Sequence, residues 1–242
     1  MKSLTKTMRK SKTTETKTVE TVEPAKVEPA KTETKKSDEK SDKDKKNTPD
    51  MYSENSVGAF VDNYFLSQRA VWIDMDIDPE MCSEVIKQLN LWIDGTKLPV
   101  YIFINSPGGS MHVASAIVDT MKALEAAGSK VYTINVALAA SAAAIIYSAG
   151  TKGCRYAYPS SRVMFHQGRY SGGLGEDLKA EDLEIYKREL DIANDMFVSL
   201  LATASGLNKV KVKELMSKDS YFSAKEAMKL GVVDKIKVFT LP

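Results

Sequence analysis

Three side chains that could together perform nucleophilic acyl transfer occur in the chain in the order serine, histidine, aspartate. Ser141 lies within the small-residue run Ala137–Ala144, His166 follows an apolar segment, and Asp219 lies just before an aromatic pair. A serine hydroxyl becomes a nucleophile when a histidine accepts its proton and a carboxylate orients the imidazole. We therefore expect Ser141 to be a nucleophile, His166 its base and Asp219 the orienting acid.

Each of these residues also has an ordinary structural interpretation. Ser141 could be the N-cap of the helix after it, because serine side chains often accept hydrogen bonds from the first helical amides. A lone histidine is often structural, and Asp219 could be a loop residue before a helix over 223–230. The chain has one other histidine, His112, which lies inside a predicted helix as a surface or packing residue. His166 is therefore the better candidate for the base.

A pair of glycines predicts a second part of the same site. Gly108 and Gly109 follow the strongly apolar strand 100–104 and precede an amphipathic helix over 111–124. Glycines at such a turn leave backbone N–H groups uncovered, so that they can point at a carbonyl oxygen or a phosphate. An oxyanion hole would use the amide of Gly108 or Gly109 together with the amide of Ala142, which follows the serine.

The elements that would position these residues alternate between strand and helix. Strands are predicted over 70–73, 100–104, 131–136 and 162–165, and helices over 111–124 and 141–149. Between the first two strands, Asp78 and Pro79 are typical of an N-cap and a first helical residue, and Gly95 is expected to end that helix. Its apolar face is formed by Met81, Val85, Ile86, Leu89, Trp92 and Ile93. The alternation predicts an α/β fold with largely parallel strands.

A longer helix is predicted after His166. The glycine-rich connection 168–175 precedes a helical pattern over 176–204. Its apolar positions recur at three- and four-residue steps and are Leu183, Tyr186, Leu190, Ala193, Phe197 and Leu200 or Leu201. A helix of this length often protrudes and contacts another subunit.

The first 50 residues differ in composition from the rest of the chain. They contain no Phe, Trp or Tyr and hold 14 Lys and Arg against 10 Asp and Glu, a net of +4, so the other residues carry −2 of the chain's net +2. Such a segment buries too little apolar area to offset the entropy of ordering. We expect residues 1–50 to be a disordered tail and residues 51–242 to be one folded domain. Mixed Lys and Glu blocks are typical of a solvated linker, so no nucleic-acid partner is indicated.

Neither a membrane nor a metal is indicated by the sequence. The sequence contains no run of ~18 apolar residues, the length needed to span a bilayer, and the tail lacks the apolar core of a secretory signal. Cys82 and Cys154 are too few for a disulfide framework, which favours a reducing, cytoplasmic location. Two histidines and two scattered cysteines do not form a zinc-type ligand set, and no metal or other cofactor is expected.

Together these segments resemble the proteolytic subunits of the Clp protease, a family of self-compartmentalising serine peptidases. The resemblance runs from about Tyr64 to Ile236 and covers four segments in the family's order: Gly-Gly after Asn-Ser-Pro, Ala-Ala-Ser, His-Gln after an apolar pair, and Asp before Phe-Ser-Ala-x-Glu-Ala. It implies the ββα spiral shared with crotonases, with the long helix as a protruding handle. It also places the triad at Ser141, His166 and Asp219, and matches none of the neighbouring residues Asp177, Asp182 and Asp191.

The resemblance further implies an assembly and a partner. The family consists of serine endopeptidases that hydrolyse unfolded proteins inside a chamber of two heptameric rings, a tetradecamer. A hexameric AAA+ ATPase unfoldase delivers the protein substrate. The chain contains no Gly-x-x-x-x-Gly-Lys-Ser/Thr phosphate loop, so any use of ATP must belong to the partner.

Departures from the family pattern leave other functions open. Ala137 replaces a glycine, Ala142 and Ala143 replace Met-Gly, and Gly168 replaces a proline. These changes bear on rate and substrate preference more than on fold. A phage-type capsid maturation protease of the same fold or an inactive ring scaffold fits a divergent member. A crotonase-type acyl-CoA enzyme would need no triad, and a relative of signal-peptide peptidase would use a Ser–Lys dyad and a membrane anchor.

Overall fold

The computed structural model of the chain describes residues 54–169 and 179–242. The predicted tail over 1–50, most of the connection 168–175 and the first residues of the predicted helix 176–204 lie outside the described residues. The strands are β1 (Ala70–Ile73), β2 (Val100–Ser106), β3 (Val131–Ala140), β4 (Arg155–Ala157), β5 (Arg162–Phe165), β6 (Ser220–Ser223) and β7 (Lys235–Ile236). The helices are α1 (Glu54–Ser67), α2 (Pro79–Leu91), α3 (Met111–Ala126), α4 (Ala142–Ser148), α5 (Ala180–Ser205), α6 (Lys209–Met216) and α7 (Ala224–Lys229).

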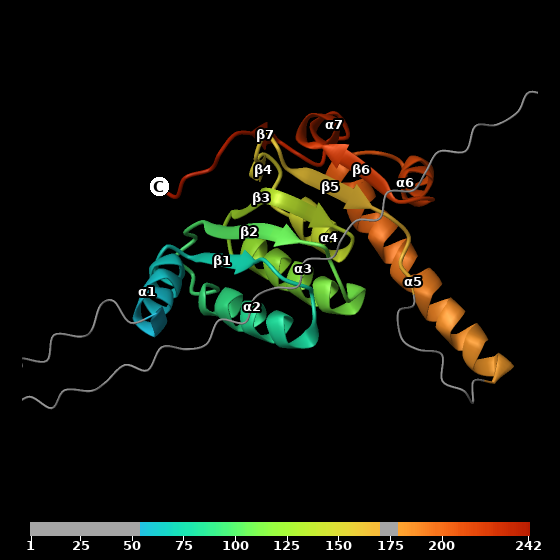
Figure 1. The fold of residues 1–242 in the computed structure, drawn as a ribbon, viewed down its shortest axis with the longest axis horizontal. Helices are drawn as coiled ribbons and strands as arrows, with labels where there is room; N and C mark the ends of the chain where they lie inside the picture. The colour runs from blue at the N-terminus through green and yellow to red at the C-terminus, as the bar shows by residue number, and fades with distance from the viewer. Residues whose placement is uncertain (1–53, 170–178) are drawn as a thin grey trace, which may run out of the picture. The chain divides into compact units, whose positions relative to one another are not determined.

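The sheet is mostly parallel, which confirms the predicted α/β fold. Its main path runs β1-β2-β3-β4-β7, and every neighbouring pair along it is parallel. β5 pairs in parallel with the end of β3 and antiparallel with β6. Figure 1 shows α2 and α3 along one face of the sheet and α5 running away from it beyond β5. Strand β2 is buried on both faces, as expected for a parallel strand inside an α/β fold.

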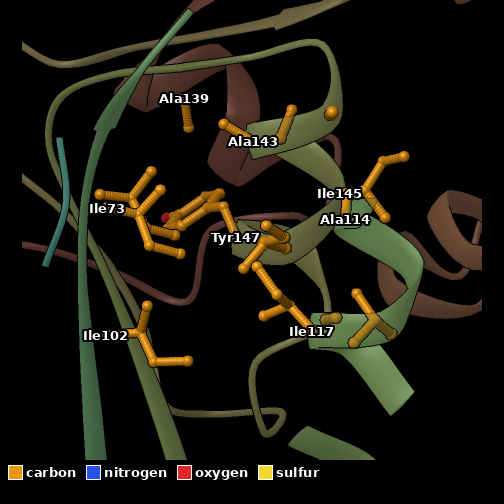
Figure 2. Close-up of a cluster of buried hydrophobic side chains, with 14 of the residues drawn as sticks. Ile73, Ile102, Ala114, Ile117, Ala139, Ala143, Ile145 and Tyr147 are labelled. Carbon is orange, nitrogen blue, oxygen red and sulfur yellow. The ribbon is translucent and has the colours of Figure 1, made fainter. Parts of the chain in front are cut away.

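The main core lies between the sheet and the helices α2, α3 and α4. All seven residues of α4 are buried, and Figure 2 shows Tyr147 pointing from this helix toward Ile73 of β1. On the other face, Phe103 and Tyr156 belong to a second apolar cluster against which the partly buried Phe239 near the C-terminus packs. Apolar side chains are buried on both faces of the sheet, and this packing stabilises it. The strand ends near α4 are therefore held in place by the core.

Helix α5 has two halves that differ in burial. Ala193, Phe197 and Leu201 are buried against the body of the domain, whereas Leu183 and Ile192 are about half exposed, at 49% and 54%. The helix begins at Ala180, because Lys179 has an extended backbone and occupies the N-cap position. The predicted start at Glu176 was therefore too early. The exposed half thus presents partly exposed apolar side chains, among them Leu183, Ile185 and Ile192.

Several other predicted boundaries were wrong. β3 continues through the alanines to Ala140, because this stretch pairs with β5, so it is not a turn after Val136. The second helix is α2; it starts as predicted, with Asp78 accepting a hydrogen bond from the amide of Met81 at 2.8 Å, but it ends at Leu91 well before Gly95. Within the described part of the chain, no helix combines the length and the apolar character needed to cross a membrane.

Candidate active site

The pairing of three strands brings the three predicted residues together. In the parallel pair β3–β5, Ala140 lies opposite Met164, so Ser141 and His166 both emerge at the same end of the sheet. In the antiparallel pair β5–β6, Phe165 lies opposite Ser220. His166 follows the one and Asp219 precedes the other, so these two residues face each other. Residues 25 and 53 positions apart from His166 thus become its neighbours.

Ser141 occupies an unusual backbone conformation between β3 and α4. Its φ is +53° and its ψ is −124°, a combination that L-residues rarely adopt. The amide of Ser141 donates to the carbonyl oxygen of Met164 at 3.0 Å, and its own carbonyl accepts from the amide of Ala144 at 3.0 Å. These bonds hold a sharp strand-to-helix turn that projects the side chain away from the core. Strain of this kind, about 1–3 kcal/mol, is typical of functional sites.

The Ser141 hydroxyl interacts with His166 and not with the helix. Its Oγ lies 2.7 Å from Nε2 of His166, whereas the side chain makes no capping hydrogen bond to α4. Ser141 occupies the N-cap position of α4, but its side chain does not cap the helix. The interpretation of Ser141 as a capping side chain is therefore wrong. With Nδ1 protonated, the imidazole would accept the hydroxyl proton at Nε2, as a general base does.

The carboxylate of Asp219 lies on the Nδ1 side of the His166 imidazole and contacts both His166 and Arg169. Its Oδ1 is 3.5 Å from Nδ1 of His166, and the same oxygen accepts a short hydrogen bond from Nη2 of Arg169. Nδ1 of His166 is buried and has no hydrogen bond to a described residue at this separation. Arg169 could not be predicted from the sequence, since nothing in a lone arginine three residues after a histidine indicates such a contact.

The electrostatic environment favours a neutral imidazole beside an ionised carboxylate. Burial lowers the pKa of His166 from its ordinary 6.5, and the Arg169 charge lowers it further, while Asp219 opposes both. The hydrogen bond from Arg169 is the main cause that lowers the pKa of Asp219 below 3.8. As the pH falls, His166 therefore stays neutral to lower pH than an exposed histidine would, and Asp219 stays ionised throughout that range.

The glycine turn packs directly against the Ser141 turn. A Cβ on Gly108, whose φ is +102°, would lie 2.6 Å from the carbonyl oxygen of Ala140 and 2.7 Å from Cβ of Ser141. The amide of Gly108 donates to Oγ of Ser106 at 3.1 Å, so it is not the uncovered N–H that the sequence suggested. The amides of Gly109 and of Ala142, the first residue of α4, have no acceptor among the described residues.

A cavity of about 730 Å³ opens beside the serine and the histidine. Its lining residues come from the glycine turn, α3, β5 and α5 and include Gly109, Met111, His112, Ser141, Met164, His166, Arg169, Glu189, Leu190 and Ala193. The alanines after Ser141 do not line it, because Ala142, Ala143 and Ala144 are buried in the core. The space beside the serine is therefore bordered by α3 and α5, and not by these alanines.

Other candidate groups are placed elsewhere or paired elsewhere. Asp182 caps α5 through the amide of Lys179, and Asp191 forms an ion pair with Lys187, so neither faces His166. Asp177 lies outside the described residues. Over residues 54–169 and 179–242, no group of three or more His, Cys, Asp or Glu could hold a metal ion. What the arrangement can do chemically is transfer a proton from a serine hydroxyl beside a partly apolar cavity.

Comparison with known proteins gives one consistent result. A sequence model of the family described as Clp protease matches residues 54–239. The ATP-dependent Clp protease proteolytic subunit 2 of Pseudomonas aeruginosa is 33% identical over 203 residues, which is 82% of this chain and 98% of that relative. Proteolytic subunit 3 of a Synechococcus strain is 37% identical over 171 residues, 70% of this chain and 82% of the relative. Proteolytic subunit 2 of a Prochlorococcus marinus strain is 36% identical over 172 residues, again 70% and 82%.

Proposed function

The chain belongs to the Clp protease family, and we propose that it is a serine endopeptidase with Ser141 as nucleophile, His166 as base and Asp219 as the acid that orients the base. The observation that carries the proposal is the 2.7 Å contact between Ser141 Oγ and His166 Nε2. It stands next to a cavity large enough for a peptide side chain and backbone.

The proposed reaction follows from these positions. Ser141 Oγ attacks the carbonyl carbon of a peptide bond while Nε2 of His166 takes the hydroxyl proton. Asp219 stabilises the imidazolium through Nδ1, and the imidazolium then protonates the leaving amine. A water molecule, deprotonated by the same nitrogen, hydrolyses the resulting acyl-enzyme and restores the serine. The serine proton thus leaves with the amine product, and the water supplies the proton that restores the serine and the hydroxyl of the new carboxylic acid.

The oxyanion of the tetrahedral intermediate needs donors that are already in place. We assign this role to the amides of Gly109 and Ala142, which lie in the two turns that meet at the site. Loss of one such donor typically removes about 3–4 kcal/mol of transition-state stabilisation. Gly108 supports the hole in a different way: its missing side chain lets the glycine turn approach the serine turn.

The alternative functions have weaker support. A crotonase-type enzyme or an inactive scaffold would leave the Ser141–His166 contact without a purpose, and a Ser–Lys dyad would need a lysine where this chain has His166. The relatives are named as proteolytic subunits of an ATP-dependent Clp protease, which favours ATP-dependent proteolysis over capsid maturation. Both cysteines of the chain, Cys82 and Cys154, are free and buried, which supports a reducing, cytoplasmic location.

We further propose that the subunit assembles into heptameric rings, paired as a tetradecamer, and receives unfolded protein from an AAA+ ATPase. The relatives' names contain the words ATP-dependent, while this chain has no phosphate-binding loop of its own. The apolar side chains on the exposed half of α5 support a subunit contact there. Ile192→Glu should therefore shift the particle to smaller species in light scattering, whereas Val210→Glu, at an exposed position of α6, should not. An unmodified protein that is monomeric and fully active would contradict the ring.

The decisive experiment for the catalytic proposal is labelling with a fluorophosphonate probe and location of the adduct by mass spectrometry. We expect a single adduct on Ser141 and none on the Ser141→Ala protein. Hydrolysis of a short fluorogenic peptide should be lost in the same variant. An adduct on another serine, or none on the native protein, would overturn the proposed function.

A further inference from the structure

Arg169 and His166 face the same oxygen of the same carboxylate. Nη2 of Arg169 donates a short hydrogen bond to Oδ1 of Asp219, and Nδ1 of His166 lies 3.5 Å from that atom. Arg169 comes from the segment that follows β5, and Asp219 from the residue before β6. The guanidinium therefore bridges the ends of the two strands that carry the proposed base and acid.

The Asp219 carboxylate has little other support. Its side chain is 46% exposed, and among the described residues only Arg169 and His166 interact with it. A carboxylate on a loop end that faces water can rotate away from the imidazole, because the His166 contact is too long to be a normal hydrogen bond. Whatever holds Asp219 toward His166 must come largely from Arg169.

On the basis of the proposed peptidase function, we propose that Arg169 is a positioning residue, whose guanidinium holds the Asp219 carboxylate against the imidazole of His166. It does not touch the reacting atoms. The role is to keep Oδ1 within reach of Nδ1 so that the imidazole presents Nε2 to the serine. A misplacement of about 1 Å in such a chain can cost about 100-fold in rate.

Arg169 also acts through its charge. It lowers the pKa of His166, second in size to burial, and it lowers the pKa of Asp219. Removing the charge raises the pKa of His166 toward its ordinary value, so the neutral base is lost at higher pH than in the native protein. The other titratable groups around this site are Tyr221 of β6, whose charge acts on Arg169, and three residues that line the cavity: His112 of α3 and Tyr186 and Glu189 of α5.

The ion pair itself should contribute little to folding. Both side chains are substantially exposed, at 65% for Arg169 and 46% for Asp219, and exposed pairs of this kind contribute little to measured stability. A positioning role therefore predicts an effect on kinetics without an effect on the melting midpoint. A purely structural role predicts the reverse.

The test compares Arg169→Met, Arg169→Lys and the control Arg162→Met in the full-length protein. Arg162 is an exposed arginine on β5, and its charge contributes to lowering the pKa of Glu226. The readouts are kcat and KM for a fluorogenic peptide, the rate of Ser141 labelling by a fluorophosphonate across pH, and the melting midpoint. We expect Arg169→Met to lower kcat by about 10-fold to 100-fold, with KM nearly unchanged and the acidic limb of the labelling rate moved to higher pH.

Arg169→Lys keeps the charge and should restore the pH limb with part of kcat, while Arg162→Met should match the native protein. An unchanged kcat and pH limb in Arg169→Met would overturn the proposal, as would a higher kcat or an effect on KM alone. A native protein that never reacts at Ser141 would overturn the proposed function, and this inference with it. A reactive native protein with an indifferent Arg169 would overturn the inference alone.

Discussion

Two strand-to-helix turns pack against each other at the candidate site, and they differ in the residues that allow this close approach. The turn after β2 uses Gly108 and Gly109, which have no side chains and adopt positive φ values of +102° and +151°. The turn after β3 places Ser141, which has a functional side chain, at a φ of +53°. The first turn provides space and backbone amides, and the second provides the reactive group.

The difference lies in what each turn must avoid. Side chains on the glycine turn would collide with the serine turn or, at Gly109, with the carbonyl oxygen of Ile77 at 2.3 Å. The serine turn accepts an unfavourable backbone, because the hydrogen bonds to Met164 and Ala144 hold it. The glycine turn thus requires residues without side chains, whereas the serine turn requires a side chain that exposes one atom, Ser141 Oγ. Substitutions in the two turns should fail in different ways.

The largest expected effect is that of Ser141→Ala, which removes the reactive atom and leaves the turn intact. Alanine has the same backbone restrictions as serine, so we expect the melting midpoint to change little. Hydrolysis of a fluorogenic peptide should fall by about 10⁶-fold, to background, by analogy with removal of a triad serine. Substantial residual activity in a sample free of contaminating peptidase would exclude Ser141 as the nucleophile.

The next largest effect concerns the two partners of that serine. His166→Ala and Asp219→Asn should each lower kcat strongly, the latter by up to about 10⁴-fold. Because the three residues would form one proton-transfer chain, either change made on top of Ser141→Ala should cost almost nothing more. Additive losses would show that the residues act independently. An Asp219→Asn variant with native kcat would leave only the Ser141–His166 pair.

Gly108→Ala tests the spacing function of the first turn, and Gly153→Ala is its control. Both glycines have positive φ, but a Cβ on Gly153 would meet nothing within 4 Å, whereas one on Gly108 would displace the serine turn. Each variant should lose about 1–2 kcal/mol from backbone strain. Only Gly108→Ala should also lose about 100-fold in kcat, from displacement of Ser141. Equal kinetic effects in the two variants would mean that backbone strain alone, and not the close approach of the two turns, explains the loss of activity in Gly108→Ala.

The parts of this comparison that sequence could predict are those with a local signal. The strand 100–104, the glycine pair and the Asp78 N-cap each follow from neighbouring residues, and all were found where expected. Ser141 and His166 were identified because each lies at the end of such an element. The pairing of β3 with β5 then brings them within 2.7 Å of each other.

What could not be predicted depends on partners remote in the sequence. The alanines up to Ala140 have low strand propensity and form a strand because β5 pairs with them. The short strand β6 exists through its register with β5, and that register is what sets Asp219 against His166. The contact with Arg169 depends on side-chain reach across 50 residues of chain. The hydrogen bond from the Gly108 amide to Ser106 could not be predicted either, because the glycine motif is the same with or without it. This bond removes one of the expected oxyanion donors.

That Ser106 contact gives the smallest and most local test of the first turn. Ser106 is fully buried, donates to the carbonyl oxygen of Met75 at 2.6 Å and accepts from the amide of Gly108 at 3.1 Å. Ser106→Ala leaves both groups without that partner, which should cost about 1–3 kcal/mol. For a domain of this size, each kcal/mol corresponds to about 2–4 °C in the melting midpoint.

Ser110→Ala is the matched control for this change, because Ser110 lies in the same turn but makes no side-chain capping bond to α3. Its melting midpoint should stay close to that of the native protein when both are measured at equal subunit concentration. In Ser106→Ala, kcat should fall by less than 10-fold, since the Gly108 amide is not one of the proposed oxyanion donors. A loss as large as that of Gly108→Ala would show that the orientation of this amide, and not only the space beside it, sets the position of Ser141.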